Sequence, residues 1–521
     1  MKRDPGALDS QSFDVLVIGG GLVGASIARD AARRGLSVAL VERDDFGCGA
    51  SRALPRLVLG AVGHHMPRGI GSLRRMFAEA AAWRRIAPHR VASQPCMAPL
   101  TGRNTVRNAT MRFALDLYRW AGSSAFPSMD RHAARLGAAE AAGLEPAIDH
   151  PALRGALVYP DWRIDEPERM VLALLKDAAA NGAVVVNHVE CDSLILLNGK
   201  LSGARLFDRI GGFWLEAWSS VVVNATGAWS DAVAARLLGR GGDGPRMKLA
   251  REVRIVAPAV AGEHALVIAE DSGDDLTIVP WQGMSVVGAA VGPFEGDPAA
   301  ADAGTDDIAR LAERVGRLLP AVQEGLASPI DGFAAVRSLP RMPEEAAAWA
   351  HLGGVTDHAG DGVAGFLSVG GGEWTTVRPL AERAVDRVVA MARRTVRPCD
   401  TGRAPLSETV AGDLDAFVAE CRHGNPYWPD GEIEAWAPSY GAALPDVIAR
   451  AGPAFRPGEQ AREAARFAYA QEEEMAVLPD DFARRMAHWY EVSRPGVAVR
   501  AAEWLAGRRE ASDPATWETG R

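Results

Sequence analysis

The chain has 521 residues, of which 48% are hydrophobic and 24% are charged, and its formal net charge is −9. These values are typical of a globular protein of about two to four domains, and the acidic balance argues against a general nucleic-acid binder, which would present a basic face. The five cysteines form no CxxC pair and the histidines are dispersed, so we expect neither a disulfide framework nor a metal site.

The N-terminus and the apolar segments carry no targeting or membrane signal. The opening MKRDPGALDSQ has no apolar core behind its basic residues, so we expect no secretory signal. No run of about 18 uncharged apolar residues occurs, so we expect no transmembrane helix. The expected location is the cytoplasm, with peripheral contact at the inner face of the membrane left open. The sequence does not indicate an oligomeric state.

The first predicted elements form a strand–helix–strand unit. Residues 15–18 are a short continuous apolar run, which is typical of a buried parallel strand. A glycine cluster follows, and then Val23, Ile27 and nearby alanines fall on one face of a helix that Gly35 is suited to end. Residues 37–41 predict the second strand. The segment therefore predicts a βαβ unit.

The turn inside this unit carries a dinucleotide-binding motif. Gly19, Gly21 and Gly24 form GxGxxG directly after the strand, where glycines allow a tight turn, close approach of a pyrophosphate, and close packing of helix on strand. The helix N-terminus offers backbone N–H groups and a partial positive charge to the phosphates. Glu42 ends the second strand about twenty residues on, where a carboxylate accepts hydrogen bonds from ribose hydroxyls and repels a 2′-phosphate. We therefore expect FAD or NAD rather than NADP.

Three later segments favour FAD over NAD. GAVVVNHVE predicts a strand whose backbone would meet an adenine, and VVVNATG places a small-residue turn after a second buried strand. In FLSVGGGEWTT a further glycine turn precedes a helix, whose N-terminus would stabilise the negative charge that builds on a reduced flavin. The FAD-contacting positions predicted from these segments are Val189, Ala225, Gly227, Gly371, Gly372 and Thr375.

The remaining predicted elements place this motif in a larger fold. Helices are expected at 73–86, 108–121, 306–318, 379–394, 459–475, 479–490 and 496–508, and strands at 182–189, 219–224, 251–267 and 276–290. A shift in composition near 395–406 predicts a linker. The predicted fold class is α/β (α+β overall), with a Rossmann-like FAD-binding part and an antiparallel-sheet substrate domain. The oxidoreductase region spans 12–395, its substrate sheet roughly 90–160 and 245–345, and a small α-helical C-terminal domain spans 403–510.

Several segments together resemble the FAD-dependent, respiratory-type glycerol-3-phosphate dehydrogenases, within the wider D-amino-acid-oxidase-like flavoproteins. The resemblance covers roughly residues 12–395 and is carried by DVLVIGGGLVGASIARDAARRGLSVALVE, YPDWRIDEPERMVLALLKDAAANGA, VNATGAWSD, AAVRSLP and GGGEWTTVRPLAE. It implies hydride transfer from a secondary alcohol to flavin N5, with a quinone or another acceptor taking the electrons. It also implies cofactor contacts at Arg43, Ser51 and Arg56, and a substrate-site arginine at Arg337.

The sequence departs from this family pattern mainly around the substrate. In LPRLVLGAVGHH, Leu59 stands where the family has a histidine, Gly63 where it has an arginine associated with the substrate phosphate, and His64 where it has a tyrosine. Arg254 stands at another family histidine, and Glu373 replaces a lysine. Each lost charge-assisted contact to a phosphate dianion leaves about 1.5–3 kcal/mol unmade, so these departures predict a changed substrate.

The candidate catalytic residues each have a structural alternative. His64 is a candidate general base or a loop residue without a role. Arg337 is a candidate substrate-orienting residue or a structural ion-pair partner. Glu373 would pair with an amine-bearing or polyhydroxylated substrate, or cap the helix start. Arg254 is a candidate replacement for a lost cation.

The leading functional hypothesis is an FAD-dependent dehydrogenase that oxidises a CH–OH donor, glycerol-3-phosphate dehydrogenase-like. Glycerol 3-phosphate or a related polyol phosphate is the best named substrate by resemblance. One alternative is an FAD-dependent amine or amino-acid oxidase-like enzyme, with Arg337 holding a carboxylate and Glu373 an ammonium group. The other is a catalytically weak flavin-binding accessory protein, which intact cofactor motifs beside altered substrate positions would also fit.

Overall fold

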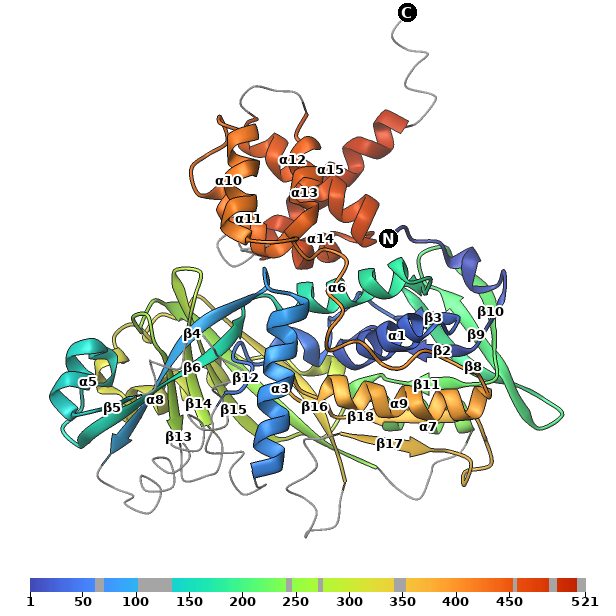
Figure 1. The fold of residues 1–521 in the computed structure, drawn as a ribbon, viewed down its shortest axis with the longest axis horizontal. Coiled ribbons are helices and arrows are strands. Elements are labelled where there is room, and N and C mark those ends of the chain that lie inside the picture. The colour runs from blue at the N-terminus through green and yellow to red at the C-terminus, as the bar shows by residue number, and fades with distance from the viewer. Residues whose placement is uncertain are drawn as a thin grey trace, which may run out of the picture.

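The computed structural model describes residues 1–60, 70–101, 134–239, 246–269, 275–341, 353–452, 457–486 and 494–512 (Figure 1). The predicted helix at 108–121 and the candidate residues Gly63 and His64 lie outside these residues. The described strands form three sheets, and a separate group of helices from the C-terminal part of the chain stands above them (Figure 1).

The predicted βαβ unit lies at the centre of a six-stranded sheet. The strand order is β17 (Gly354–Asp357), β18 (Phe366–Gly370), β11 (Val222–Asn224), β2 (Val15–Ile18), β3 (Val38–Val41) and β7 (Val184–Val186). All neighbours are parallel except β17, which runs antiparallel to β18. The central strands are buried on both faces, which explains their continuous apolar runs.

Alternate residues of these strands face two different layers. Val15 and Val17 pack with the helices α1 (Leu22–Arg34), α6 (Pro167–Ala180) and α9 (Val377–Ala392). On the opposite face, Leu16 and Ile18 pack against α7 (Ser230–Leu238) and a four-stranded sheet. That sheet has the order β1 (Ser12–Phe13), β10 (Phe213–Ser219), β9 (Lys200–Asp208) and β8 (Val189–Leu197). This second layer differs from the prediction, in which only the substrate domain formed an antiparallel sheet.

The predicted substrate sheet is an eight-stranded sheet beside the first. Its order is β16 (Asp331–Pro340), β12 (Met247–Pro258), β15 (Met284–Pro293), β14 (Asp275–Trp281), β13 (Ala265–Ala269), β4 (Val91–Thr101), β6 (Leu153–Ile164) and β5 (Ala134–Leu136). Its pairings are antiparallel except for β13 with β4. The segments 251–267 and 276–290, predicted as strands of an antiparallel sheet, each contain parts of two strands. Gln282 and Gly283, both at positive φ, make the turn that divides the second segment.

Two faces of the eight-stranded sheet have different roles. Val253, Ile255 and Ala257 of β12 pack against the amphipathic helix α8 (Thr305–Leu318). Glu252 and Arg254 alternate with them and therefore point to the opposite face, toward the parallel sheet. Two further described helices are α3 (Ile70–Ile86), which precedes β4 in the chain, and α5 (Ala138–Leu144), which precedes β6.

The C-terminal helices form their own buried clusters. They are α10 (Leu414–Gly424), α11 (Glu432–Tyr440), α12 (Leu444–Ala449), α13 (Glu459–Glu474), α14 (Pro479–Arg485) and α15 (Arg494–Ser512). Trp436, Tyr440 and Tyr469 centre one cluster, and Phe467 and Phe482 centre another. Figure 1 shows these helices next to α6. Within the described ranges, no helix combines the length and apolar character that a bilayer crossing needs.

Candidate active site

A cavity of about 370 Å³ lies between the carboxyl ends of the parallel strands and the eight-stranded sheet. This is the edge at which open α/β sheets bind their ligands. Ten of the predicted cofactor-binding residues line it: Gly19, Gly21, Glu42, Arg43, Ser51, Val189, Ala225, Gly227, Gly371 and Gly372. Arg337 and Glu373 line its other end. Four other predicted residues lie outside this lining. Gly24 and Thr375 follow lining residues within two positions of the chain, and Arg56 and Arg254 are buried in the protein.

The glycine turn after β2 has no room for side chains. A Cβ on Gly19, whose φ is +108°, would lie 2.6 Å from the carbonyl oxygen of Ala225, and one on Gly24 would lie 1.9 Å from the carbonyl oxygen of Gly19. These contacts bring α1 and β11 against the turn, as the motif requires. Ser51 Oγ accepts a hydrogen bond from Leu22 N at 2.9 Å, which places the loop 49–53 over the helix N-terminus.

Glu42 lies at the end of β3, where the motif predicts a ribose-binding carboxylate. Its two oxygens accept hydrogen bonds from Gly20 N at 2.7 Å and from Asp44 N at 2.9 Å. Burial raises the pKa of Glu42, and these two N–H groups oppose that effect. The carboxyl group thus holds the glycine turn and the following loop together while it lines the cavity.

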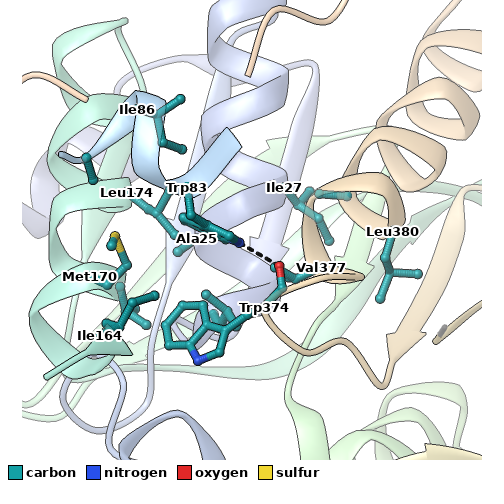
Figure 2. Close-up of a cluster of buried hydrophobic side chains, with 14 of the residues drawn as sticks. Ala25, Ile27, Trp83, Ile86, Ile164, Met170, Leu174, Trp374, Val377 and Leu380 are labelled. Carbon is teal, nitrogen blue, oxygen red and sulfur yellow. Dashed lines mark hydrogen bonds between the residues drawn. The ribbon is translucent and has the colours of Figure 1, made fainter. Parts of the chain in front are cut away.

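The second glycine turn is held in place by Trp374. The indole of Trp374 is almost fully buried, and its Nε1 donates to Pro55 O at 2.8 Å. The ring of Trp83 on α3 packs edge-on against it, and Trp83 Nε1 donates to Trp374 O at 2.5 Å (Figure 2). The turn that lines the cavity at Gly371 to Glu373 is therefore tied to the loop before residue 56 and to α3. Neither tryptophan was among the predicted site residues.

Four alternating charges run from the sheet to this turn. Arg254 Nη1 donates to Glu252 Oε2 at 2.9 Å, and Glu252 Oε1 lies 2.7 Å from Nε of Arg337. Arg337 Nη1 in turn donates to Glu373 Oε1. Because Ala250 is opposite Arg337 and Glu252 is opposite Ala335 in the β12–β16 register, the side chains of Glu252 and Arg337 share one face. We call Arg254, Glu252, Arg337 and Glu373 the charge chain.

The charge chain has a buried and an accessible half. Arg254 and Glu252 are each 9% exposed, whereas Arg337 is 32% and Glu373 27% exposed. Burial would raise the pKa of Glu252, but Arg254 and Arg337 outweigh it, so the pKa of this carboxyl is lowered. Burial lowers the pKa of Arg254, which also donates to Ala53 O at 2.6 Å. Two cations and two anions thus balance at the end of the cavity.

The structure brings the predicted residues Arg337, Glu373 and Arg254 together, and Glu252, which was not predicted, joins them. The available signal was its position two residues before Arg254 in a predicted strand, which places both side chains on the same face. Arg254 is not a free cation, because its guanidinium is held by Glu252 and by Ala53 O.

Arg56 does not line the cavity. It is 5% exposed and its guanidinium lies over the ring of Trp281, 5.3 Å from the centroid. Its Nε and Nη1 are buried and find no hydrogen-bond partner in the part of the chain that the structure describes. Arg56 thus stacks behind the loop 50–55, and its contact with the cofactor stays a prediction.

Leu59 and Gly60 are held by a carboxyl that the sequence analysis also missed. Asp161 on β6 is buried and accepts hydrogen bonds from Leu59 N at 3.1 Å, Gly60 N at 2.9 Å and Trp162 N at 2.6 Å. Burial raises the pKa of Asp161 to about 7, in spite of these three N–H groups. Asp161 belongs to the YPDWRIDEP segment, which carries part of the family resemblance.

Comparison with known proteins assigns the chain to a family. Residues 14–378 match the family described as FAD dependent oxidoreductase. The chain belongs to this family of FAD-dependent oxidoreductases. A glycerol-3-phosphate dehydrogenase of Mycobacterium leprae is 30% identical to it over 94% of this chain and 83% of the relative. One from Synechocystis is 27% identical over 92% of this chain and 89% of the relative.

A solved structure shows the same fold. The glycerol-3-phosphate dehydrogenase of Bacillus halodurans, complexed with FAD, matches at a TM-score of 0.76 and 24% identity, covering 96% of this chain and 92% of that chain. These matches confirm the resemblance to the FAD-dependent glycerol-3-phosphate dehydrogenase family, and FAD is the cofactor of this oxidoreductase. The crowded turn at Gly19 and Gly24, with Glu42 at one end of the cavity and the second glycine turn at the other, fits a dinucleotide in this place.

Proposed function

We propose that this oxidoreductase is a dehydrogenase that oxidises a CH–OH donor at the Arg337 end of the cavity. The observation that carries the proposal is the contact between Arg337 on β16 and Glu373 on the second glycine turn. This contact joins the eight-stranded sheet to the turn at which the flavin ring is expected. A donor bound beside Arg337 would therefore contact the sheet and lie next to the flavin. When bound, FAD would accept hydride at N5.

The accessible half of the charge chain supplies two roles in this proposal. Arg337 orients the donor oxygen, because its guanidinium presents several N–H donors in a fixed plane. Glu373 or His64 takes the hydroxyl proton as the hydride leaves. Glu252 contacts Arg337 from the buried side and is itself held by Arg254, which fixes the position of Arg337 relative to the turn.

Glycerol 3-phosphate, or a related polyol phosphate, is the first donor proposed. Its support is that the relatives which match over most of this chain are glycerol-3-phosphate dehydrogenases. A quinone is the proposed electron acceptor, on the family resemblance alone.

A second candidate is a donor that carries an amine. Arg337 already contacts two carboxylates, Glu252 and Glu373, so much of its charge is neutralised before any donor binds. Glu373 is accessible and would attract an ammonium group, while Arg337 would keep one face for a carboxylate. This arrangement favours an amino acid over a phosphate dianion.

Anaerobic reduction of the bound flavin would separate these candidates. The purified yellow protein is mixed without oxygen with glycerol 3-phosphate, glycerol, other polyol phosphates, 2-hydroxy acids and amino acids, and the flavin absorbance is followed. Bleaching by an alcohol supports the dehydrogenase proposal, and bleaching by amino acids alone overturns it in favour of the second candidate. Bleaching by no compound, while dithionite still reduces the flavin, contradicts both and supports an accessory flavin-binding protein.

A further inference from the structure

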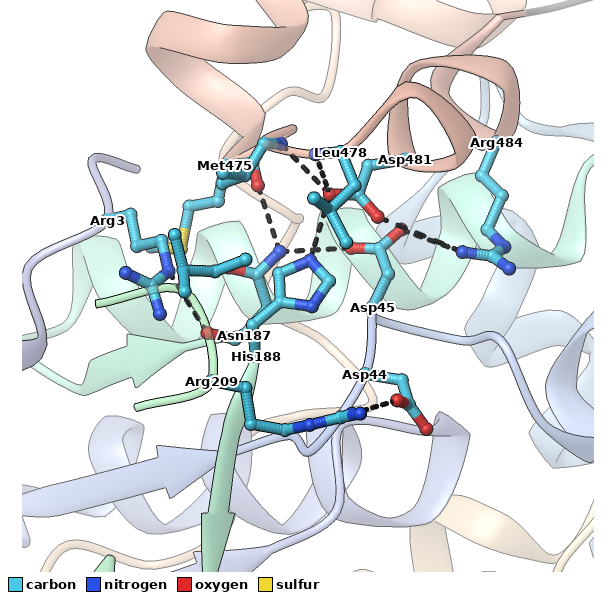
Figure 3. Close-up of polar contacts among 12 residues, drawn as sticks. Arg3, Asp44, Asp45, Asn187, His188, Arg209, Met475, Leu478, Asp481 and Arg484 are labelled. Atoms are coloured by element: carbon cyan, nitrogen blue, oxygen red, sulfur yellow. Dashed lines mark hydrogen bonds and ion pairs between the residues drawn. The ribbon is translucent and has the colours of Figure 1, made fainter. Parts of the chain in front are cut away.

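The C-terminal helices contact the chain directly behind the FAD-binding end of the cavity. The contact is a buried polar cluster of Asp45, Asn187, His188, Asp481 and Arg485, which we call the Asp45 cluster (Figure 3 labels the first four). Asp45 follows the cavity-lining residues 42–44, and His188 precedes the cavity-lining Val189. Asp481 and Arg485 belong to α14.

The strongest contact in the cluster is a two-point ion pair. Both oxygens of Asp45 accept from Arg485, at 2.7 Å from Nη1 and 2.7 Å from Nη2, and both side chains are fully or almost fully buried. Asn187 Nδ2 adds a hydrogen bond to Asp45 Oδ1 at 3.1 Å. A planar guanidinium that meets a carboxylate at two points fixes orientation as well as distance.

The second contact fixes the neighbouring loop. His188 Nε2 lies 2.9 Å from Asp481 Oδ2, and Asn187 Nδ2 also donates to Met475 O at 2.9 Å (Figure 3). Asp481 accepts further hydrogen bonds from Val477 N and Leu478 N. The turn between α13 and α14 therefore holds residues 187–188 from outside.

These contacts are one residue away from the cavity lining. His188 N donates to Asp44 O at 3.0 Å and Val189 N donates to Glu42 O at 2.7 Å, so the two loops are bonded to each other. Their inner residues, Glu42 and Val189, face the cavity, and their outer residues, Asp45 and His188, face α14. A shift of α14 would thus reach the two residues that are expected to contact the ribose and adenine.

We propose that the C-terminal helices lock the loops 42–49 and 187–190 in their FAD-binding conformation, with Asp45 and Arg485 as positioning residues for the cofactor. Apolar contacts would hold the C-terminal helices on the rest of the protein equally well, because the cost of desolvation offsets much of the attraction in a buried ion pair. What the pair adds is a defined geometry at the loop that carries Glu42. By linkage, FAD binding and docking of α13 and α14 then strengthen each other.

The test compares FAD affinity in variants of the interface. Arg485→Met and Asp45→Asn break the ion pair, and Arg485→Lys keeps the charge but not the two-point geometry. The matched control is Arg251→Met, which breaks a partly buried pair between β12 and α8, Arg251 Nη2 to Asp307 Oδ2 at 2.6 Å, outside the cavity lining. The dissociation constant of FAD is measured by titrating each full-length apoprotein and following the quenching of flavin fluorescence.

We expect Arg485→Met and Asp45→Asn to weaken FAD binding by at least about tenfold, and Arg485→Lys by less. Arg251→Met should leave the dissociation constant of FAD within about twofold of the wild-type value, even if its melting temperature falls as much as that of Arg485→Met. Equal FAD affinity in Arg485→Met, Asp45→Asn and the wild type would overturn the proposal, whatever their stability.

Hydrogen exchange on the wild-type protein tests the same linkage without a variant. Addition of FAD to the apoprotein should slow amide exchange in residues 457–486 as well as in residues 42–49. Protection confined to the cavity lining, with no change in 457–486, would overturn the proposal. Neither measurement uses a donor, so both outcomes are independent of the proposed reaction.

Discussion

Glu252 on β12 lies 2.7 Å from the Nε of Arg337 on β16, and its second oxygen accepts a hydrogen bond from Arg254. The arginine that the family resemblance places at the substrate is therefore held from behind by a carboxylate and from the front by Glu373. The four side chains of the charge chain carry no net charge, so a phosphate dianion at Arg337 would gain less from this arginine than from an unpaired one.

Replacement of Glu373 is expected to change the preference for phosphate. In Glu373→Lys, Arg337 loses an anionic neighbour and a second cation faces the cavity. The gain of a charge-assisted contact is worth about 1.5–3 kcal/mol, so the half-saturating concentration of glycerol 3-phosphate, relative to that of glycerol, should fall about 10-fold or more. Anaerobic flavin reduction at a series of donor concentrations measures this ratio.

The control for this change is Glu313→Lys on α8, where the carboxylate is 67% exposed and lies outside the cavity lining. It makes the same change in net charge and should leave the ratio unaltered. An unchanged ratio in Glu373→Lys as well would show that Glu373 does not select against phosphate.

Replacement of Glu252 is expected to destabilise the fold and create an anion site. Glu252→Gln keeps the shape but leaves Arg254 and Arg337 without their shared carboxylate, and removal of one partner from a buried ion pair costs about 3–5 kcal/mol. Sulfate should recover part of this loss by binding the freed guanidinium groups. Urea unfolding with and without sulfate measures both effects, and the exposed Glu263→Gln serves as the control. A variant as stable as the wild type would contradict the structural role of Glu252.

A methyl group at Gly24 is expected to abolish FAD retention. The Cβ in Gly24→Ala would lie 1.9 Å from the carbonyl oxygen of Gly19, so α1 must move away from the phosphate-binding turn. The purified variant should lack the absorbance of bound flavin. Gly143→Ala in α5, where no heavy atom lies within 4 Å of the added Cβ, should bind FAD like the wild type. Wild-type flavin content in Gly24→Ala would contradict the assigned turn.

Asp161 predicts a pH dependence of stability with a defined sign. Its pKa is raised from 3.8 to about 7 in the folded protein, so between these values the native state binds more protons than the unfolded state. The contribution of Asp161 to the free energy of unfolding is therefore fully present below about pH 4. It is lost as the pH rises through 7, by up to roughly 4 kcal/mol. Asp161→Asn should remove this loss.

Unfolding free energies of the wild type and Asp161→Asn, measured between pH 5 and pH 8, test this directly. The difference between the two proteins should shift in favour of the variant as the pH rises. The exposed Asp149→Asn should show the pH profile of the wild type. Parallel profiles for the wild type and Asp161→Asn would mean that Asp161 does not titrate in this range.

Local patterns in the sequence determine the cofactor end of the site. This part of the site lies within about 30 residues and contains the strand, the glycine turn, the helix and Glu42. Glycine is needed at Gly19 and Gly24 because a Cβ there would collide with nearby backbone atoms. The amphipathic pattern likewise predicts α8, which is found at Thr305–Leu318. Such features follow from neighbours in the chain, so they can be predicted without the fold.

The donor end of the site depends on strand register, and only the tertiary structure decides it. The pairing of β12 with β16 brings Glu252 beside Arg337, and the packing of the second glycine turn on Trp83 brings Glu373 to the same guanidinium. Arg485 reaches Asp45 across 440 positions of the chain. A charge pattern along the sequence does not show which charges meet, because ion pairing depends on distances that the register and the packing of distant segments set. The sequence alone therefore determined the cofactor, whereas the folded structure decided which charges face the donor.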